Sequence, residues 1–449
     1  REAAEHHAAG RPAQALALFD RLVRLKPDHA DAWNDRGNAL DALRRREEAL
    51  ASYERALAID PAHRHARNGR ANMLQAFGRL DEAIGDYQAV LDRDPRYVHA
   101  WNGLGNTWMA MNRHEQAIEA YQRARAIRTD HPDANFNEGL ARLSLGDFEN
   151  GWPLHEWRWE LPFWRDRRRG FSQPLWTGRE DLAGRRVLLH AEQGFGDTLQ
   201  FCRYVPQVAA LGAEVLLEVQ PALRALMASL PGVHTLLSRG DALPPFDVHC
   251  PLLSLPLAFG TREQTIPPAC PDLAPPADRI AHWRERLGPA SRARIGLVWQ
   301  GNPGHDNDRN RSMRLAALRP LFELPVDWIS LQRPMPAADR EEAAALPFAH
   351  DLGEALSDFA DTAAVVSLLD GVVAVDTAVA HVAGALSRPG WLLLPWVADW
   401  RWMRGREDSP WYPAMRLLRQ PAPGAWDPVV DRLVSDLARW GEGRPSTGA

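Results

Sequence analysis

A pattern that recurs every 34 residues occupies the first third of the chain and restricts how this part can fold. An alanine recurs at this spacing, and an aromatic residue follows it four positions later each time. These residues are Ala15, Ala49, Ala83 and Ala117, and Phe19, Tyr53, Tyr87 and Tyr121, with closing prolines at Pro27, Pro61 and Pro95. A repeat of this length indicates stacked units, because one unit alone cannot bury its apolar face.

The small residue, the aromatic residue and the closing proline are together typical of the tetratricopeptide repeat. Each repeat is a helix pair, and stacked pairs form a solenoid with a concave groove. We expect full repeats up to residue 134 and a further one that begins at 135. Such grooves usually bind a protein or peptide, so the repeats predict a protein partner.

Composition excludes several classes of protein. A chain of 449 residues suggests more than one domain. Its net charge of −5 argues against general nucleic-acid binding, which needs a basic surface. Cys202, Cys250 and Cys270 are too few and too scattered for a disulfide framework or a zinc site. No apolar run reaches the roughly 18 residues of a membrane span, so we expect a cytoplasmic protein without a membrane span or a nucleic-acid partner.

From residue 183 onward, strand and helix patterns alternate, which predicts parallel sheets in α/β domains. Ligands of such sheets bind beyond the carboxyl ends of the strands, so we expect a site between two sheets. The expected regions are a solenoid over 1–150, a capping or linking segment over 151–182, a first Rossmann-like domain with a Pro-rich linker over 183–276, a second over 277–426, and a helix with a tail over 427–449.

The turn after the first predicted strand carries the first candidate site. Residues 192–198 (EQGFGDT) imitate the dinucleotide fingerprint G-x-G-x-x-G, but Leu199 replaces its third glycine. Glu218 could imitate the ribose-binding acid of that fingerprint. Asp197 could accept a proton from an attacking hydroxyl, or it could serve only as the N-cap of its helix. We take Asp197 as the catalytic candidate, with three neighbours in the same loop: Gln193, Gly194 and Gly196.

A second turn of the same kind lies at 371–381 (GVVAVDTAVAH). Small side chains at Thr377 and Ala378 would let the N–H groups of a helix N-terminus approach a phosphate. His381 lies four residues after Thr377, hence on the same helical face. The alternative is that Asp376 caps the helix and that His381 is a packed core residue.

The loop over 299–312 (WQGNPGHDNDRNRS) follows the first strand of the second predicted domain. Arg309 and Arg311 could pair with a diphosphate. Asp306 and Asp308 resemble a metal-holding D-x-D, but a solvated, salt-bridged turn is simpler, so we predict no metal site. Asn302 in this loop is a further candidate near the active site.

An aromatic loop over 396–402 (WVADWRW) follows another predicted strand. Its rings, with Trp400 as the candidate, could pack on a base or a sugar, or they could simply pack the loop. Gln332, which ends the predicted strand 326–332, is counted with the donor-binding candidates.

In this order, these segments resemble the catalytic module of bacterial tetratricopeptide-repeat glycosyltransferases, a group similar to heptosyltransferases and, more distantly, to protein O-GlcNAc transferases. The likeness covers nearly all of 1–440. The matching stretches are GDFENGWPLHEWRW, LLHAEQGFGDTLQFCRY, FDVHCPLLSLPLAFGT, GLVWQGNPGHDNDRNRS, VAVDTAVAHVAGALSRPGWLLLP and DWRW…SPWYP.

The resemblance implies a GT-B fold, with a nucleotide-sugar donor on the second domain, an acceptor on the first, and inverting transfer without a metal or other cofactor. Asp197 matches the family's proposed base. Relatives often have a lysine where only Arg309 or Arg311 is available here. The residues that match the donor-phosphate motif are Asp376, Thr377, Ala378 and His381.

The repeats imply a protein acceptor, and some relatives glycosylate flagellin. Two alternatives stay open: a protein-binding scaffold beside an inactive module, and a lipopolysaccharide glycosyltransferase whose repeats serve assembly. We expect asparagine pairs in the first helix of each repeat to face the groove and bind a peptide backbone, unless they bond only to neighbouring helices. These pairs are Asn34 and Asn38, Asn68 and Asn72, and Asn102 and Asn106.

Overall fold

The computed structural model describes residues 2–268, 273–305 and 307–442. Cys270, Asp306 and part of the Pro-rich linker lie outside these residues. The chain divides into two compact units, which are described separately. One consists of Arg1–Arg142 with Pro153–Arg165, and the other of Leu143–Trp152 with Asp166–Ala449.

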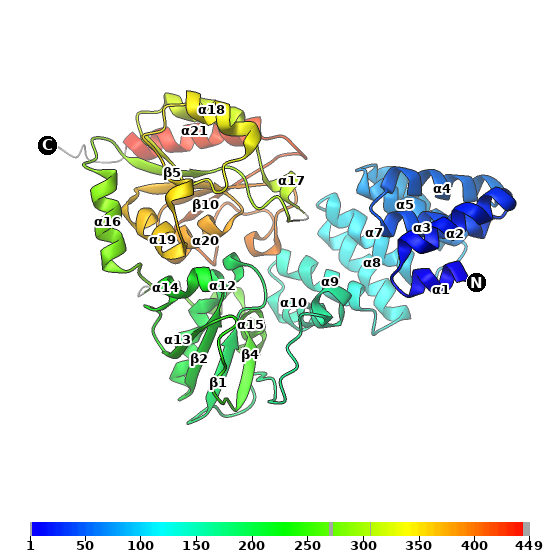
Figure 1. Ribbon diagram of the computed structural model, residues 1–449, viewed down its shortest axis with the longest axis horizontal. Coiled ribbons are helices and arrows are strands. Elements are labelled where there is room, and N and C mark those ends of the chain that lie inside the picture. The colour runs from blue at the N-terminus through cyan, green and yellow to red at the C-terminus, as the bar shows by residue number, and fades with distance from the viewer. Residues whose placement is uncertain (1, 269–272, 306, 443–449) are drawn as a thin grey trace. The chain divides into compact units, whose positions relative to one another are not determined.

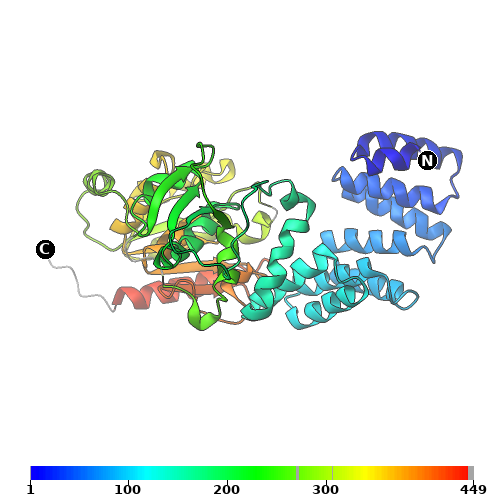
Figure 2. The same cartoon turned by 90° about the horizontal axis from the view of Figure 1, so that it is seen from below.

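The first unit is built from successive helix pairs, coloured blue to cyan in Figures 1 and 2. The helices are α1 (Glu2–Ala8), α2 (Pro12–Leu25), α3 (Ala30–Ala42), α4 (Arg46–Ile59), α5 (Arg64–Ala76), α6 (Leu80–Leu91), α7 (Val98–Ala110), α8 (His114–Ile127), α9 (Pro132–Ser144), α10 (Phe148–His155) and α11 (Pro162–Arg165). The end of α9 and most of α10 lie in the segment Leu143–Trp152, which belongs to the second unit. From α1 to α8 each helix packs on the next one, and α5 also packs on α3 and α7, the first helices of the neighbouring repeats.

The periodic residues form the core of this unit. The four periodic alanines are fully buried, and Tyr53, Tyr87 and Tyr121 are at most 2% exposed. The ring of Tyr53 lies so close to Gly37 and Gly69 that a Cβ on either glycine would approach it to 2.6 or 2.5 Å. The repeat therefore requires a small residue wherever a tyrosine of the second helix meets a first helix.

A histidine caps several first helices at the same 34-residue spacing. The Nδ1 atoms of His29, His63 and His131 each accept a hydrogen bond from a backbone N–H three residues later, at 3.2, 3.1 and 3.3 Å. An acceptor at this position satisfies one of the N–H groups that a helix N-terminus leaves free. The repeated cap requires Nδ1 to be unprotonated.

The second unit contains two sheets in which all neighbouring strands are parallel. The first has the order β3-β2-β1-β4, and the second β10-β9-β8-β5-β6-β7. Their strands are β1 (Arg186–His190), β2 (Glu214–Val219), β3 (Val233–Ser238), β4 (Val248–Pro251), β5 (Arg294–Val298), β6 (Asp327–Ser330), β7 (His350–Asp351), β8 (Gly371–Val375), β9 (Gly390–Leu394) and β10 (Met415–Arg419). The prediction of parallel α/β structure after the solenoid is confirmed.

Helices connect and cover these strands, as Figure 1 shows. Buried leucines and tryptophans of the second sheet pack against α21, whose apolar face includes Val430, Leu433 and Leu437. The longer helices of this unit are α12 (Phe195–Phe201), α13 (Val205–Ala210), α16 (Ala277–Leu287), α18 (Arg340–Ala345), α19 (Phe359–Leu368), α20 (Ala378–Ala385) and α21 (Asp427–Glu442). The four-residue helices are α14 (Arg224–Met227), α15 (Leu255–Ala258) and α17 (Asp308–Arg311).

Candidate functional site

Both sheets of the second unit have a point where the strand order reverses. In the second sheet β5 and β8 are neighbours, and the chain continues outward from each in opposite directions. In the first sheet the chain passes outward from β1 to β2 and β3, and β4 then pairs with the other side of β1. Loops that leave the carboxyl ends of strands at such a point form the usual ligand crevice of α/β proteins. The loops after β1, β5 and β8 carry the residues that the sequence singled out.

Asp197 lies at the third position of α12, and Gly194 is the N-cap residue. Asp197 is therefore not the N-cap residue that the alternative interpretation made it. Its Oδ2 accepts a hydrogen bond of 2.8 Å from the N–H of Gly194, which closes the first turn from inside the helix. Its Oδ1 forms an ion pair with the guanidinium of Arg401. Burial raises the pKa of Asp197, against the opposing effect of Arg401.

Side chains of the first sheet hold the turn before Asp197 in place. Gln220, which follows β2, donates from Nε2 to the carbonyl of Gln193 at 3.0 Å and to that of Gly194 at 3.3 Å. It accepts a bond of 2.9 Å from the hydroxyl of Thr198. Glu218, which could have imitated the ribose-binding acid, is buried and forms an ion pair with Arg169. Its carboxylate is therefore engaged within the protein.

Arg401 lies in a short 3-10 helix, η9 (Trp400–Trp402), and the sequence analysis did not select it. Its Nη1 is 2.8 Å from Oδ1 of Asp399, so two carboxylates share one guanidinium. The guanidinium carbon lies 4.5 Å from the centroid of the Trp400 ring. Its Nε is buried and has no hydrogen-bond partner among the described residues. A single cation inside an aromatic run was the signal that could have revealed this residue.

Helix α20 begins at Ala378, with Thr377 rather than Asp376 at the N-cap position. Asp376 is therefore not the N-cap residue, contrary to the alternative interpretation. Thr377 makes no capping bond, and its buried Oγ1 has no partner among the described residues. The helix start thus retains N–H groups that an anion can accept from. Burial and the nearby Asp399 carboxylate raise the pKa of Asp376 to about 6.

His381 is a packed residue, as the alternative interpretation predicted. It is 5% exposed, and its Nδ1 lies 2.9 Å from the hydroxyl of Tyr412. Burial, together with Arg401, lowers its pKa to about 3, so the ring is neutral. The ring meets Gly196 closely, because a Cβ at Gly196 would lie 2.6 Å from its Cδ2. This contact joins the start of α12 to α20.

The loop after β5 brings one of the two expected arginines to α20. Nη1 of Arg311 donates to the main-chain carbonyl of Asp376 at 2.9 Å. Its Nε lies 3.3 Å from Oδ1 of Asp308, which also accepts a bond of 2.8 Å from Ser312. The salt-bridged turn is therefore present. Arg309 is exposed and has no hydrogen bond or ion pair within the described part of the chain.

Two other candidates are engaged within the protein. The amide of Gln332 accepts from the N–H groups of Trp299 and Gln300 at 3.1 and 3.0 Å, and it donates to Gln300 and Pro334. Its side chain thus links the loops after β5 and β6. Asn302 is exposed and accepts a bond of 2.9 Å from Gly304, two residues later.

Trp400 packs in an aromatic cluster rather than presenting an open face. It is 6% exposed, and its ring centroid lies 5.3 Å from that of Trp152, with the planes at 88°. Phe201 and Trp411 lie 6.4 Å away. The cluster packs the segment Leu143–Trp152 against the rest of the second unit, and in this structure Trp400 has a packing role.

The asparagine pairs of the repeats differ in exposure. Asn34 and Asn68 are buried, and their Oδ1 atoms have no hydrogen-bond partner among the described residues. The second members accept hydrogen bonds from tyrosine hydroxyls of the following helix. These bonds run from Tyr53 to Asn38 at 2.8 Å, from Tyr87 to Asn72 at 2.6 Å and from Tyr121 to Asn106 at 2.7 Å.

Each such bond fixes the orientation of an amide. Because the tyrosine hydroxyl occupies Oδ1, the Nδ2 donors are left for another partner. Asn102 and Asn106 also accept from Asn137, at 3.4 and 3.0 Å. Bonding to neighbouring helices is therefore real for these asparagines, and it leaves Nδ2 of Asn38 and Asn72 available.

Comparisons with known proteins identify the repeats. A family model of the tetratricopeptide repeat matches residues 2–64, 68–132 and 109–151. The N-terminal repeats are therefore tetratricopeptide repeats, as predicted. Protein FlbA of Caulobacter vibrioides is 27% identical over 335 residues, which are 67% of this chain and 54% of that protein. The chain thus spans about half the length of the curated relative that it matches.

Solved structures with similar helical repeats include MamA from Desulfovibrio magneticus RS-1 and PilW, described as a widely conserved type IV pilus biogenesis factor. MamA is 18% identical, with a TM-score of 0.30 over 36% of this chain and 91% of that one. PilW is 20% identical, with a TM-score of 0.33 over 35% of this chain and 73% of that one.

Two features are absent from the described residues. No helix there is both long enough and apolar enough to cross a membrane. Likewise, residues 2–268, 273–305 and 307–442 hold no group of three or more His, Cys, Asp and Glu side chains arranged to bind a metal ion.

Proposed function

We propose that this chain is an inverting glycosyltransferase of GT-B fold, which transfers a sugar from a nucleotide-sugar donor to a protein held by the repeats. The observation that carries the proposal is the meeting of two strand–helix turns in one compact unit. Asp197 follows β1, the open start of α20 follows β8, and the contact between Gly196 and His381 joins them.

The donor diphosphate would bind at the start of α20. Helix N-termini favour anions, because their free N–H groups and the helix dipole both point toward the ligand. Arg311 already contacts the carbonyl of Asp376 at 2.9 Å, so its guanidinium is next to this helix start. These groups would stabilise the negative charge that develops on the departing nucleotide, and in this proposal no metal or other cofactor takes part.

Asp197 would accept the proton of the acceptor hydroxyl. A general base works best when its pKa approaches the working pH, and burial raises the pKa of this carboxyl. Arg401 engages Oδ1 of Asp197 in an ion pair and therefore competes with the acceptor hydroxyl for this oxygen. Arg401 would therefore turn toward the diphosphate when the donor binds, and this exchange would free Asp197.

The acceptor would be a protein, because tetratricopeptide repeats bind proteins and peptides. The free Nδ2 donors of Asn38 and Asn72 suit the carbonyl oxygens of an extended chain. A protein-binding scaffold with an inactive module is the second candidate function. The ion pair between Asp197 and Arg401 favours this candidate, because it engages the carboxylate that would have to act as the base.

The full chain should be titrated by calorimetry with a panel of nucleoside diphosphates in excess EDTA. One diphosphate is expected to bind, and the matching nucleotide sugar should be hydrolysed slowly in the absence of an acceptor. Thr377→Leu should weaken this binding, because a larger side chain would crowd the helix start. If no nucleotide binds and no nucleotide sugar is consumed, the scaffold is the correct function.

A further inference from the structure

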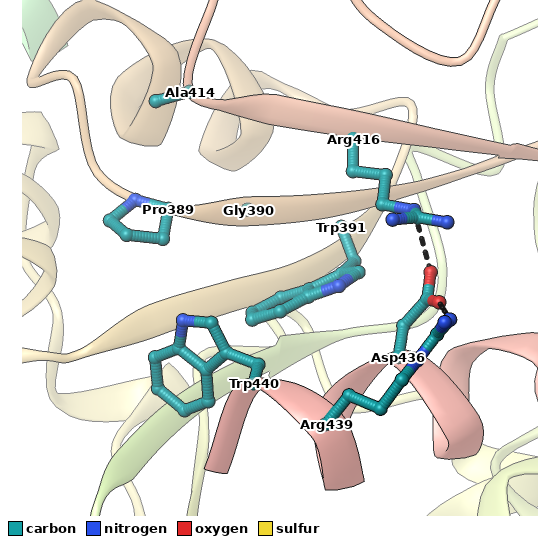
Figure 3. A pocket seen from close by; sticks show the side chains of 8 residues that line it. All are labelled: Pro389, Gly390, Trp391, Ala414, Arg416, Asp436, Arg439 and Trp440. Atoms are coloured by element: carbon teal, nitrogen blue, oxygen red, sulfur yellow. Dashed lines mark hydrogen bonds and ion pairs between the residues drawn. The ribbon is translucent and has the colours of Figure 1, made fainter. Parts of the chain in front are cut away.

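A cavity of about 440 Å³ lies at the edge of the second sheet opposite the candidate site. It opens at the amino ends of β9 and β10, against the last turns of α21 (Figure 3). The loops described above all leave carboxyl ends of strands, so this cavity is a separate place in the fold. Its volume falls within the roughly 300–1,000 Å³ of small-molecule sites.

One wall of the cavity is aromatic. Trp391 of β9 and Trp440 of α21 meet edge to face, with ring centroids 5.3 Å apart and planes at 88°. Trp391 is 5% exposed and fixed in the core, whereas Trp440 is half-buried. Pro389 and Ala414 extend the apolar lining. Such a wall accepts the flat face of a sugar or aromatic ring.

The other wall is positively charged. Asp436 is 2% exposed and binds two guanidinium groups, with 2.6 Å to Nε of Arg416 and 2.6 Å to Nη2 of Arg439. Glu407 forms an ion pair with Arg432 and lies 3.7 Å from Arg416. Among the residues that line the cavity, two arginines thus face one carboxylate, which leaves one positive charge uncompensated beside the tryptophans.

The arginines are held in position yet keep donors for a ligand. A guanidinium has five N–H donors, and Asp436 uses only part of each set. The side chains of Arg416 and Arg439 are 42% and 69% exposed, so their outer N–H groups are accessible. A buried carboxylate that fixes two arginines lowers the ordering cost of binding an anion.

We propose that this cavity binds a small ring compound that bears a carboxylate. The carboxylate accepts hydrogen bonds from Arg416 and Arg439, and the ring lies against Trp391 and Trp440. Acidic sugars and aromatic acids share this chemistry. The proposal does not depend on the transferase activity, because none of these residues belongs to the candidate site.

The test uses the full chain with two acids and their uncharged counterparts. Glucuronate is compared with glucose, and indole-3-acetate with tryptophol, by saturation-transfer NMR and calorimetry. One acid is expected to bind saturably in the millimolar range or below, and its neutral counterpart at least about tenfold more weakly. Which of the two acids binds more tightly shows whether the cavity prefers an acidic sugar or an aromatic acid.

Variants assign the binding to this cavity. Arg439→Gln and Trp440→Ala should each weaken the acid at least about tenfold. Thr377→Leu, at the start of α20, and Arg284→Gln, on α16, lie outside the cavity and should each leave its affinity unchanged. Arg439 is largely exposed, so its variant decides the matter even if Trp440→Ala fails to fold.

Three results would overturn the proposal. One is that neither acid binds saturably. Another is an affinity that Arg439→Gln leaves unchanged. The third is a loss of affinity in Thr377→Leu, which would put the binding at the start of α20.

Discussion

Asp197 and Arg401 form an ion pair although 204 positions separate them in the chain. The pair joins the loop after β1 to the loop after β9, and hence the two sheets of the second unit. It brings a buried cation to the carboxylate that is proposed as the base. The chemistry of the site depends on how this pair is broken and re-formed.

Asp197→Asn is expected to reduce glycosyl transfer about 10²–10⁴-fold, because an amide cannot accept the acceptor proton. The amide oxygen can still accept the N–H of Gly194, so the first turn of α12 should survive. Turnover and the melting temperature are measured together. Near-normal turnover with a lowered melting temperature would show that Asp197 has only a structural role.

Arg401→Met should move the acidic limb of the pH–rate profile to higher pH. Arg401 opposes the rise in the pKa of Asp197, so its loss lets burial raise this pKa further, and deprotonation then requires a higher pH. Arg401→Lys keeps the charge and should shift the profile less. If neither variant shifts the acidic limb from its position in the unchanged protein, Arg401 does not influence the pKa of the base.

Pyrophosphate binding at α20 should strengthen as the pH falls from about 8 to about 5. The pKa of Asp376 is raised to about 6, so its carboxyl becomes neutral over this range and no longer repels an anion. Calorimetry at several pH values measures the effect. Asp376→Asn is the control, because its side chain is neutral at every pH. Its affinity for pyrophosphate should lack the contribution from Asp376, and the pH dependence that remains should come from the titration of pyrophosphate itself.

Asn72→Asp should weaken acceptor binding while the repeats remain folded. The carboxylate still accepts the hydrogen bond from Tyr87, but the Nδ2 donors are lost. Tyr87→Phe is the matched variant, because it removes the internal bond and keeps the amide. Acceptor affinity and thermal unfolding are measured for both. If only Tyr87→Phe impairs binding, the asparagines are structural.

The helical signal of the repeats should melt at a lower temperature as the pH falls below about 6.5, the ordinary pKa of histidine. Burial lowers the pKa of His131 in the folded state, so the unfolded chain takes up protons first. The stability is therefore full above pH 6.5 and falls as the pH decreases toward the folded pKa. His131→Asn keeps a cap without titration, and its melting temperature should fall less over the same range.

The sequence predicted the elements whose signal is local. The strands β5, β8 and β9 are continuous apolar runs, as buried parallel strands usually are. No such run marks β10, which carries arginines at positions 416 and 419, or β7, which has only two residues.

The same distinction applies to the candidate site. Asp197 and Asp376 were found because each stands at a strand–helix turn. Arg401 was not, because its importance arises from a contact with a distant residue. Gln332 and Trp400 were identified as candidates, but their internal hydrogen bonds and packing depend on tertiary structure that no spacing reveals.

The close contact between Gly196 and His381 has a mechanical consequence. This contact itself contains no hydrogen bond and rests on dispersion, so it can act as a pivot, whereas opening of the crevice must also break the ion pair between Asp197 and Arg401. A hinge motion that widened the crevice could turn about this point. An alanine at position 196 would place a methyl group against the ring of His381. It would keep the two halves apart even though every charged residue is unchanged.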